Sequence, residues 1–343
     1  FTVQTLSTDT IANQAAGGTW ASGGNMNSGK YAGIGGAGTQ TAGLAFAGAN
    51  PAGVAVATNE SYDGSSWTEL ADLNTAKSML GSTGQSPYTA AFGFGGDRPG
   101  GFTDTAETWN GSSWTEVAEL NSARASLSGA GTYTAGLAFG GRTPPNSPSA
   151  LTETWNGSSW TEVADLNTPK GYRSGAGSST AALATGGHPP TGNTESWNGS
   201  AWTEVADLNS GRAYLPDNGG ANTSAIVAGG YTTTYVANTE TFDGSSWTEV
   251  ADLSGARGWG GSFGNLSALA YFGGTPPTGT TATEEFTAPS DFNQQIEGQL
   301  FFNSTANAFK ETIKDIPAGT WASVAGLNTG RSENGASGTA ADA

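Results

Sequence analysis

The sequence predicts an all-β protein in which about six four-stranded antiparallel units close into a ring, a β-propeller. Three observations predict this class. The 343-residue chain contains 54 glycines and 11 tryptophans but few of the residues that favour long helices. A near-identical string recurs along the chain. Successive copies lie 42 to 47 residues apart, which is the length of a four-stranded propeller blade.

The recurring string ends in tryptophan. It reads Glu-Thr-Trp-Asn-Gly-Ser-Ser-Trp over residues 107–114 and 153–160, with close variants at 60–67, 195–202 and 240–247. One more copy of the final tryptophan precedes these by 47 residues. The six residues are Trp20, Trp67, Trp114, Trp160, Trp202 and Trp247. Because one buried tryptophan hides roughly 150–250 Å² of surface, we expect this set to anchor the core.

Each repeat divides into four expected strands. The first follows a basic residue, as in residues 125–131. The second is small and apolar and ends in a glycine pair, as in residues 137–141. The third carries the Glu-Thr-Trp. An Asn-Gly or Asp-Gly turn, which tolerates positive φ, then leads to the fourth strand, as in residues 114–120.

A basic residue recurs at one fixed place after the fourth strands. These residues are Lys30, Lys77, Arg124, Lys170, Arg212, Arg257 and Arg331. In the full repeats an acid lies five residues earlier, at Asp72, Glu119, Asp165, Asp207 and Asp252. We interpret base and acid as a repeated ion pair that ties the edge of a blade to its neighbour, and not as ligand-binding groups.

The two ends of the repeat region are expected to meet. We assign residues 1–14 to a lead-in and residues 15–286 to the propeller. The sixth repeat has no Asn-Gly turn after its third strand at 281–286, so the segment around Trp20 is expected to supply the missing fourth strand. Such pairing removes the free edges of the sheets. Counting Trp321 as a further repeat gives seven blades, which is the alternative.

Residues 287–343 differ in composition from the repeats. We expect residues 287–317 to form a linker with a short β-hairpin. Residues 318–343 hold a partial repeat in which 319–323 nearly duplicate 18–22. Three uses are open to this segment: it competes for the slot of the N-terminal strand, begins another propeller, or pairs with a neighbouring subunit to make a homo-oligomer.

Several spaced features occur together between Trp20 and Phe286. A glycine pair is followed by an aromatic about a dozen residues later, a tryptophan five further on and a basic residue ten after that. In this combination the chain resembles the kelch β-propellers. It departs from the kelch pattern in its third-strand aromatic, which is usually Trp here and not Tyr.

A second resemblance concerns the source of the chain. Residues 298–303, Gly-Gln-Leu-Phe-Phe-Asn, with Phe309 and Lys310, resemble an element of bacteriophage tail-fibre and virion proteins. Such proteins, notably from marine phages, also carry similar Trp-Asn-Gly-Ser-Ser-Trp repeats. The resemblance implies a virion-exposed protein with a structural, adhesive or receptor-binding function.

The sequence gives little support to catalytic or cofactor chemistry. With no cysteine and His188 as the single histidine, neither a thiolate site nor a histidine-rich zinc or copper site can form. The crosslinked cysteine of kelch-type copper oxidases is excluded for the same reason. The net charge of −17 argues against nucleic acid, and no segment has the apolar length of a membrane span. We therefore expect no enzyme, cofactor or metal, and a glycan-cleaving enzyme is the third hypothesis.

The least repeated segments connect second to third strands, and they hold the candidate ligand-binding residues. The candidates are Arg98, Phe102, Arg142, His188, Tyr231 and Tyr235. These connections leave the blades at the same end, so we expect them on one face, where loops of a rigid scaffold recognise ligands. Neutral drift of tolerant loops is the alternative. The expected function is binding of a host-surface glycan or protein receptor, and the second hypothesis is a purely structural virion or fibre subunit.

Overall fold

The computed structural model describes residues 17–217, 219–289, 300–303 and 308–311. The chain divides into two units at Pro289. In the second unit, β29 (Leu300–Asn303) and β30 (Ala308–Glu311) form an antiparallel hairpin. The proposed lead-in at 1–14 and the partial repeat at 318–343, with Trp321 and Arg331, lie outside the described residues.

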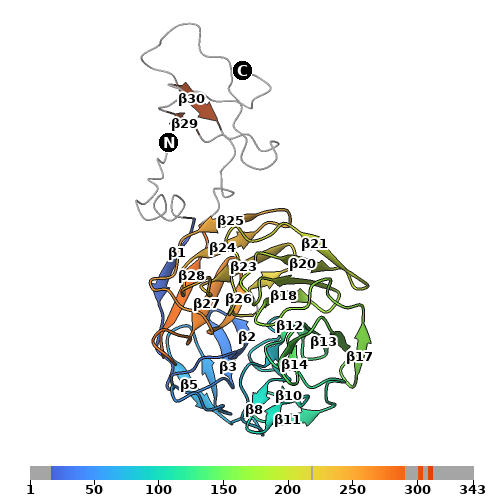
Figure 1. The fold of residues 1–343 in the computed structure, drawn as a ribbon. Coiled ribbons are helices and arrows are strands. Elements are labelled where there is room, and N and C mark those ends of the chain that lie inside the picture. Colours follow the sequence, from blue (N-terminus) through green and yellow to red (C-terminus); the bar gives the residue numbers. More distant parts are fainter. Residues whose placement is uncertain (1–16, 218, 290–299, 304–307, 312–343) are drawn as a thin grey trace. The chain divides into compact units, whose positions relative to one another are not determined.

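Six four-stranded antiparallel sheets stand as blades around a central axis in the first unit (Figure 1). Blade 1 consists of β2 (Gly35–Thr39), β3 (Ala42–Phe46), β4 (Asn59–Tyr62) and β5 (Trp67–Leu70). Blade 2 consists of β6 (Gly81–Ser82), β7 (Phe92–Phe94), β10 (Ala106–Trp109) and β11 (Trp114–Val117). Blade 3 consists of β12 (Ser128–Thr132), β13 (Ala135–Phe139), β16 (Thr152–Trp155) and β17 (Trp160–Val163). Blade 4 consists of β18 (Ser174–Ser178), β19 (Ala181–Thr185), β20 (Thr194–Trp197) and β21 (Trp202–Val205). Blade 5 consists of β22 (Gly220–Ala221), β23 (Ser224–Ala228), β24 (Thr239–Phe242) and β25 (Trp247–Val250). Blade 6 consists of β26 (Gly261–Asn265), β27 (Ala268–Phe272), β28 (Thr283–Thr287) and β1 (Thr19–Ser22). The six-bladed β-propeller is confirmed, and the seven-bladed alternative is not what the described residues form.

Blade 6 is completed by the beginning of the chain. Strand β1 pairs antiparallel with β28, with Trp20 opposite Phe286, and the two lie side by side in Figure 1. The indole of Trp20 packs on the ring of Phe286 at 5.3 Å and donates its N–H to the carbonyl of Ala251 at 2.9 Å. The first and last strands of the ring thus share one sheet.

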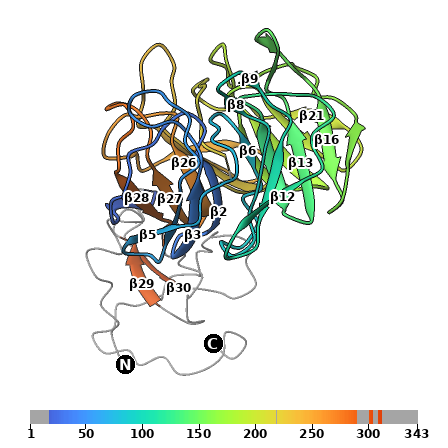
Figure 2. The same cartoon turned by 90° about the horizontal axis from the view of Figure 1, so that it is seen from below.

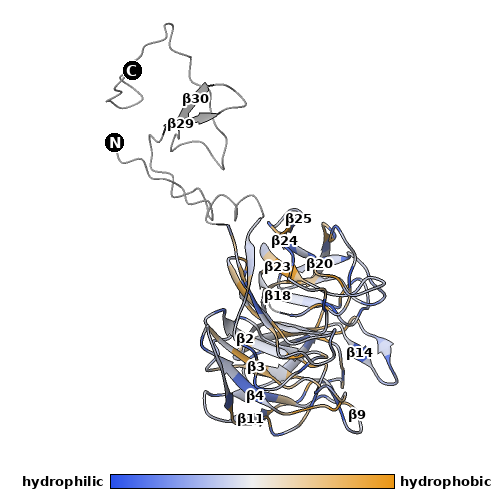
Figure 3. Cartoon of the chain, turned by 90° about the vertical axis from the view of Figure 1, so that its left-hand side faces the viewer, coloured by the Kyte–Doolittle hydropathy of each residue, from blue (hydrophilic) through white to orange (hydrophobic). Residues whose placement is uncertain are grey.

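The core lies between neighbouring blades. Second strands such as β23 are apolar, whereas third strands such as β4 are hydrophilic (Figure 3). The phenylalanine that ends a second strand packs on the fourth-strand tryptophan of the next blade. Centroid distances are 4.8 Å for Phe46–Trp114, 5.1 Å for Phe94–Trp160, 5.0 Å for Phe139–Trp202 and 5.3 Å for Phe272–Trp67. The tryptophans of the repeat therefore join blades, as well as filling them.

The glycine pairs make a second link between blades. Five blades have a glycine pair here and blade 1 has Ala47-Gly48, and in all six the second residue is a glycine with φ between 95° and 126°, in the left-handed region. Its N–H donates to the carbonyl of the repeated base in the next blade, and the donors are Gly48, Gly96, Gly141, Gly187, Gly230 and Gly274. The bond from Gly274 to Lys30, at 2.8 Å, joins the last blade to the first.

Five of the six repeated bases in the described residues form a buried ion pair, but the partner differs from the prediction. The carboxylate comes from the third strand of the same blade. The pairs are Lys30–Glu60, Lys77–Glu107, Arg124–Glu153, Arg212–Glu240 and Arg257–Glu284. Three of the acids five residues before the bases, Asp165, Asp207 and Asp252, instead accept a backbone N–H, as Asp165 does from Thr152 at 3.2 Å. The third-strand glutamates are closed off from water, and a buried charge requires a partner of opposite sign.

The prediction for Lys170 is wrong. Arg173, not Lys170, pairs with Glu195 in blade 4, at 3.4 Å. Arg173 occupies the place that Leu80 and Leu127 fill in blades 2 and 3. Because its side chain is longer than leucine, its guanidinium reaches both Glu195 and the carbonyl of Gly186. Lys170 is left half-buried, without an ion-pair partner among the described residues.

The same glutamates connect each blade to the loop that precedes it. Asn74, which follows the fourth strand of blade 1, donates its backbone N–H to Glu107 of blade 2 at 2.8 Å. Its side-chain amide donates to the same carboxylate and to the carbonyl of Trp114. Asn27, Asn121, Asn167 and Asn209 make the equivalent backbone bond at their junctions.

Candidate functional site: the channel mouth

Six equivalent residues surround the central axis at one face of the ring. Each lies two residues after the repeated basic position, and each has a left-handed backbone with φ between 53° and 63°. They are Ala32, Met79, Ser126, Tyr172, Tyr214 and Trp259. Successive members are linked by backbone hydrogen bonds, such as Tyr172 N–H to Ser126 C=O at 2.9 Å. Left-handed conformations are unfavourable for side chains of this size and persist where the surrounding structure fixes them. We call this set the axial ring.

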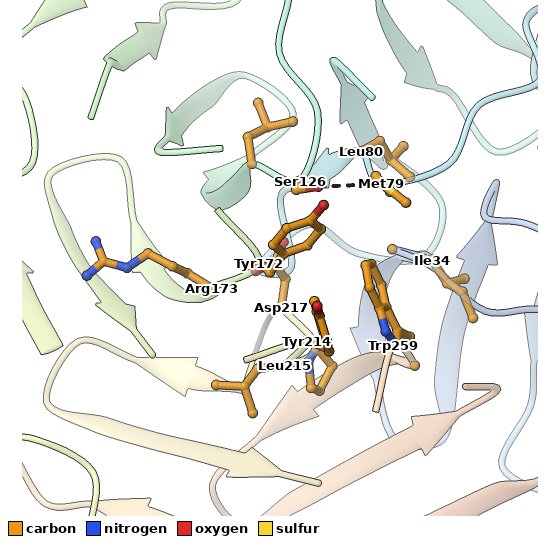
Figure 4. Close-up of a pocket in the computed structure, with 14 residues that line it drawn as sticks. Ile34, Met79, Leu80, Ser126, Tyr172, Arg173, Tyr214, Leu215, Asp217 and Trp259 are labelled. Carbon is orange, nitrogen blue, oxygen red and sulfur yellow. Dashed lines mark hydrogen bonds between the residues drawn. The ribbon is translucent and has the colours of Figure 1, made fainter. Parts of the chain in front are cut away.

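The axial ring is uneven in composition. Blades 1 to 3 contribute Ala32, Met79 and Ser126, whereas blades 4 to 6 contribute the aromatics Tyr172, Tyr214 and Trp259. Figure 4 shows the three aromatic side chains converging beside the axis, while Arg173 points away into its blade. The indole of Trp259 stacks on Tyr214 with a centroid distance of 4.1 Å and an interplanar angle of 15°. Tyr172 meets both rings edge-on at 5.1 Å.

The connections after the glycine pairs surround the aromatic half of the axial ring. The residue that follows each pair forms a β-bridge with the residue that precedes the axial one, as His188 does with Gly171 and Tyr231 with Ala213. This places the imidazole of His188 parallel to the ring of Tyr214 at 5.7 Å. Tyr231 packs on Tyr214 at 5.5 Å.

Two further side chains complete the group. Tyr235 lies edge-on to Tyr231 at 5.3 Å, and the guanidinium carbon of Arg142 lies 5.3 Å from the ring centroid of Tyr172. A cation over an aromatic face at this distance is favourable. We call these seven residues the mouth cluster, and all are partly exposed: Arg142, Tyr172, His188, Tyr214, Tyr231, Tyr235 and Trp259.

The electrostatics of the mouth cluster are positive on one side. Burial, together with the charges of Arg142 and Lys170, lowers the pKa of His188, so its imidazole is neutral at pH 7. Burial and the charge of Arg173 lower the pKa of Lys170. Burial raises the pKa of Tyr214, so its hydroxyl stays protonated and able to donate a hydrogen bond.

A small cavity lies under the axial ring. It measures about 40 Å³ and is bordered by Asp217, Leu215 and Arg173 together with axial-ring residues (Figure 4). Burial raises the pKa of Asp217 well above its usual range, and the N–H of Gly175, 2.8 Å from its carboxylate, opposes that shift. The volume suits water and is far too small for a sugar.

The opposite end of the axis has a different character. The turns between first and second strands surround a wider hollow of about 660 Å³ there. Its described lining consists of uncharged residues such as Thr39, Ser86 and Asn265. The rings and cations of the propeller axis thus gather at the mouth cluster.

The structure brings together four of the six candidates from the sequence: Arg142, His188, Tyr231 and Tyr235. Arg98 and Phe102 lie elsewhere, in the hairpin of β8 (Asp97–Arg98) and β9 (Gly101–Phe102), which stands at one face of the ring in Figure 2. Arg98 is exposed and Phe102 is partly buried.

Sequence reasoning missed Tyr172, Tyr214 and Trp259. A signal was present, because the residue two after the repeated base changes from Ala, Met and Ser to three aromatics along the chain. What the repeat alignment could not show is that this position adopts a left-handed backbone and meets its equivalents at the axis.

Two further features of the described residues concern metal binding and membrane spans. No group of three or more His, Cys, Asp or Glu side chains could hold a metal ion there. Nor does that part of the chain contain a helix long and apolar enough to cross a membrane.

Fold and site together define the class of protein, a six-bladed β-propeller with an aromatic, cationic opening at one end of its axis. The solved structure of YjhT is similar to this chain, with a TM-score of 0.61 and 14% sequence identity. The similarity covers 77% of this chain and 96% of YjhT, and at this identity it concerns the fold alone. No protein-family model matches the chain, and no curated protein matches it.

Proposed function

We propose that this propeller is a binding module that recognises a saccharide at the channel mouth. The observation that carries the proposal is the mouth cluster, in which five tyrosine and tryptophan rings from three blades gather and remain partly exposed. A sugar has one apolar C–H face and a rim of hydroxyls. Rigid amphipathic rings match both parts at little entropic cost.

The position of the cluster also supports recognition. Its residues come from connections and axial positions held by a closed ring of sheets, so little ordering is required on binding. Loops on a rigid scaffold are the common location of binding sites.

Binding without catalysis is part of the proposal. Hydrolysis of a glycosidic bond ordinarily uses two carboxyl groups that flank it. Among the described residues that border the cavity, Asp217 is the single carboxylate, and it lies beneath the axial ring. The third hypothesis, a glycan-cleaving enzyme, therefore lacks a supporting observation at this site.

The setting we propose is the surface of a virion or another extracellular particle. The resemblance of the repeats and of residues 298–303 to phage fibre proteins supports this location. A tail-fibre propeller that binds a host-surface glycan at several equivalent sites gains avidity from weak individual contacts. Copies joined through the C-terminal extension would supply those sites, and the kelch-like repeat would serve as their scaffold.

The test is a glycan-array screen of the full chain, followed by calorimetry on the best ligand. We expect Trp259→Ala and Tyr214→Ala to weaken binding by about tenfold or more, because each removes a ring of the stacked pair. Tyr88→Ala is the matched control, since Tyr88 is 40% exposed and outside the cluster. It should bind like the unchanged chain.

Other outcomes would count against the proposal. Equal loss in Tyr88→Ala and Trp259→Ala would place recognition away from the mouth. If no glycan binds and the chain instead forms regular assemblies, the purely structural virion or fibre subunit becomes the better hypothesis.

A further inference from the structure

The basic residues of the propeller fall into two groups. Residues 17–289 contain nine lysines and arginines, and six of these form the buried ion pairs. The other three, Arg98, Arg142 and Lys170, have no ion-pair partner among the described residues. Of these three, Arg142 belongs to the mouth cluster and Lys170 lies beside it, in a chain whose net charge is −17.

In blade 4 a different base pairs with the buried glutamate, which leaves Lys170 without that ion pair. In the other five blades the base two residues before the axial ring is buried against its glutamate. In blade 4, Arg173 satisfies Glu195. Lys170, two residues before Tyr172, is therefore available beside the cluster.

Backbone contacts hold Lys170 and Arg142 near each other. The carbonyl of Lys170 accepts the N–H of Gly141, the neighbour of Arg142, at 2.9 Å. The side chain of Arg142 packs over Gly171 so closely that a Cβ there would lie 2.9 Å from its Cγ. The guanidinium then rests over Tyr172 and donates to the carbonyl of Asn146 at 3.2 Å. Its remaining N–H groups are directed at no carboxylate in the described residues.

From this geometry we infer that the mouth prefers a saccharide that carries a carboxylate. The sugar ring would lie on Tyr214 and Trp259, and the carboxylate would bind between Arg142 and Lys170. The inference rests on the proposed saccharide-binding function. Arginine matches a carboxylate with paired N–H donors, and lysine adds a compact charge. The neutral imidazole of His188, which feels the charges of both, offers one ring nitrogen as a hydrogen-bond donor.

The inference is tested on glycan pairs that differ only in a carboxylate or a hydroxymethyl group at C6, measured by calorimetry with the full chain. The acidic member should bind about tenfold tighter or more. Lys170→Gln and Arg142→Gln should each reduce that preference to about threefold or less, while Lys170→Arg should retain it. Arg98→Gln is the matched control, because Arg98 is also unpaired but lies in the β8–β9 hairpin.

Salt provides a second readout. A higher sodium chloride concentration should weaken the binding of the acidic ligand and leave the binding of the neutral ligand nearly unchanged, since salt screens interactions between charges. Neutral glycans that bind at the mouth with no acidic preference would overturn this inference and leave the proposed function intact. Absence of any glycan binding would overturn both. An acidic preference that survives both Lys170→Gln and Arg142→Gln would show that other groups select the anion.

Discussion

At the scale of single residues, the arginine at position 173 changes what the repeat can do. It stands where blades 2, 3 and 5 have leucine, and it pairs with the buried carboxylate of Glu195. The side chain of Lys170, which keeps the repeated basic position, forms no ion pair among the described residues. The sequence predicted that a base is required in every blade, but the identity of that base in blade 4 depended on side-chain reach.

Two substitutions distinguish these roles. Arg173→Met should lower the free energy of unfolding by about 3–5 kcal/mol, because it leaves the Glu195 carboxylate buried and unpaired. Lys170→Met should cost less than about 1 kcal/mol, since no buried partner is lost. Urea denaturation followed by tryptophan fluorescence measures both. Equal costs would contradict the assignment of the ion pair to Arg173.

At the scale of elements, strand boundaries depended on contacts between blades. The sequence predicted a first strand over residues 125–131, but β12 begins at Ser128. Ala125 instead bridges to Arg142, and Ser126 turns with φ of 54° into the axial ring. The local sequence pattern favoured an extended strand there. It did not show that Ser126 would meet the equivalent residues of the other blades at the axis.

The glycine pairs were recognisable as strand ends, whereas their bonding to the next blade required the tertiary structure. The first position of a pair accepts alanine, as Ala47 shows with φ of 59°. The second position does not vary among the six blades. Its larger φ and its hydrogen bond to the neighbouring base carbonyl together demand glycine.

Gly274→Ala tests this role at the junction of blades 6 and 1. Gly274 has φ of 101°, and an added Cβ would lie 2.7 Å from the carbonyl of Gly258. We expect a loss of about 1–3 kcal/mol in the free energy of unfolding. Gly255→Ala is the control, because nothing lies within 4 Å of a Cβ there. Differential scanning calorimetry that finds equal midpoints for the two variants would refute the argument.

At the scale of the whole molecule, closure of the ring joins segments more than 200 residues apart. Besides the pairing of β1 with β28, the amide of Gln40 donates to the carbonyls of Leu269 and Phe286, and Tyr62 donates to Glu285 at 2.6 Å. Blades 1 and 6 are thus linked by side chains as well as by the shared sheet.

Two deletions separate closure from assembly. Removing residues 1–22 should lower the thermal unfolding midpoint and promote self-association, because it exposes the edge of β28 and the ring of Phe286. Removing residues 318–343 should leave the midpoint unchanged, since the six described blades are complete without them. We propose that this segment joins copies of the chain, so light scattering should then report a smaller assembly. An unchanged assembly would contradict that proposal.

The sequence by itself determined the class of fold and favoured six blades, and the structure decided between six and the alternative of seven. Recurring tryptophans, glycine pairs and Asn-Gly turns are local requirements of four-stranded blades, and they repeat at the length of one blade. It also indicated which connections vary, and four of its six candidates meet in the mouth cluster.

Only the tertiary structure decided which charges pair and which side chains reach the axis. Glu60 and its equivalents lie some 30 residues from their bases, so their pairing depends on the path of three strands. Tyr172, Tyr214 and Trp259 belong to different repeats and meet because ring closure brings equivalent positions together. A repeat pattern fixes what each blade contains, while contacts at the axis arise from the arrangement of all six.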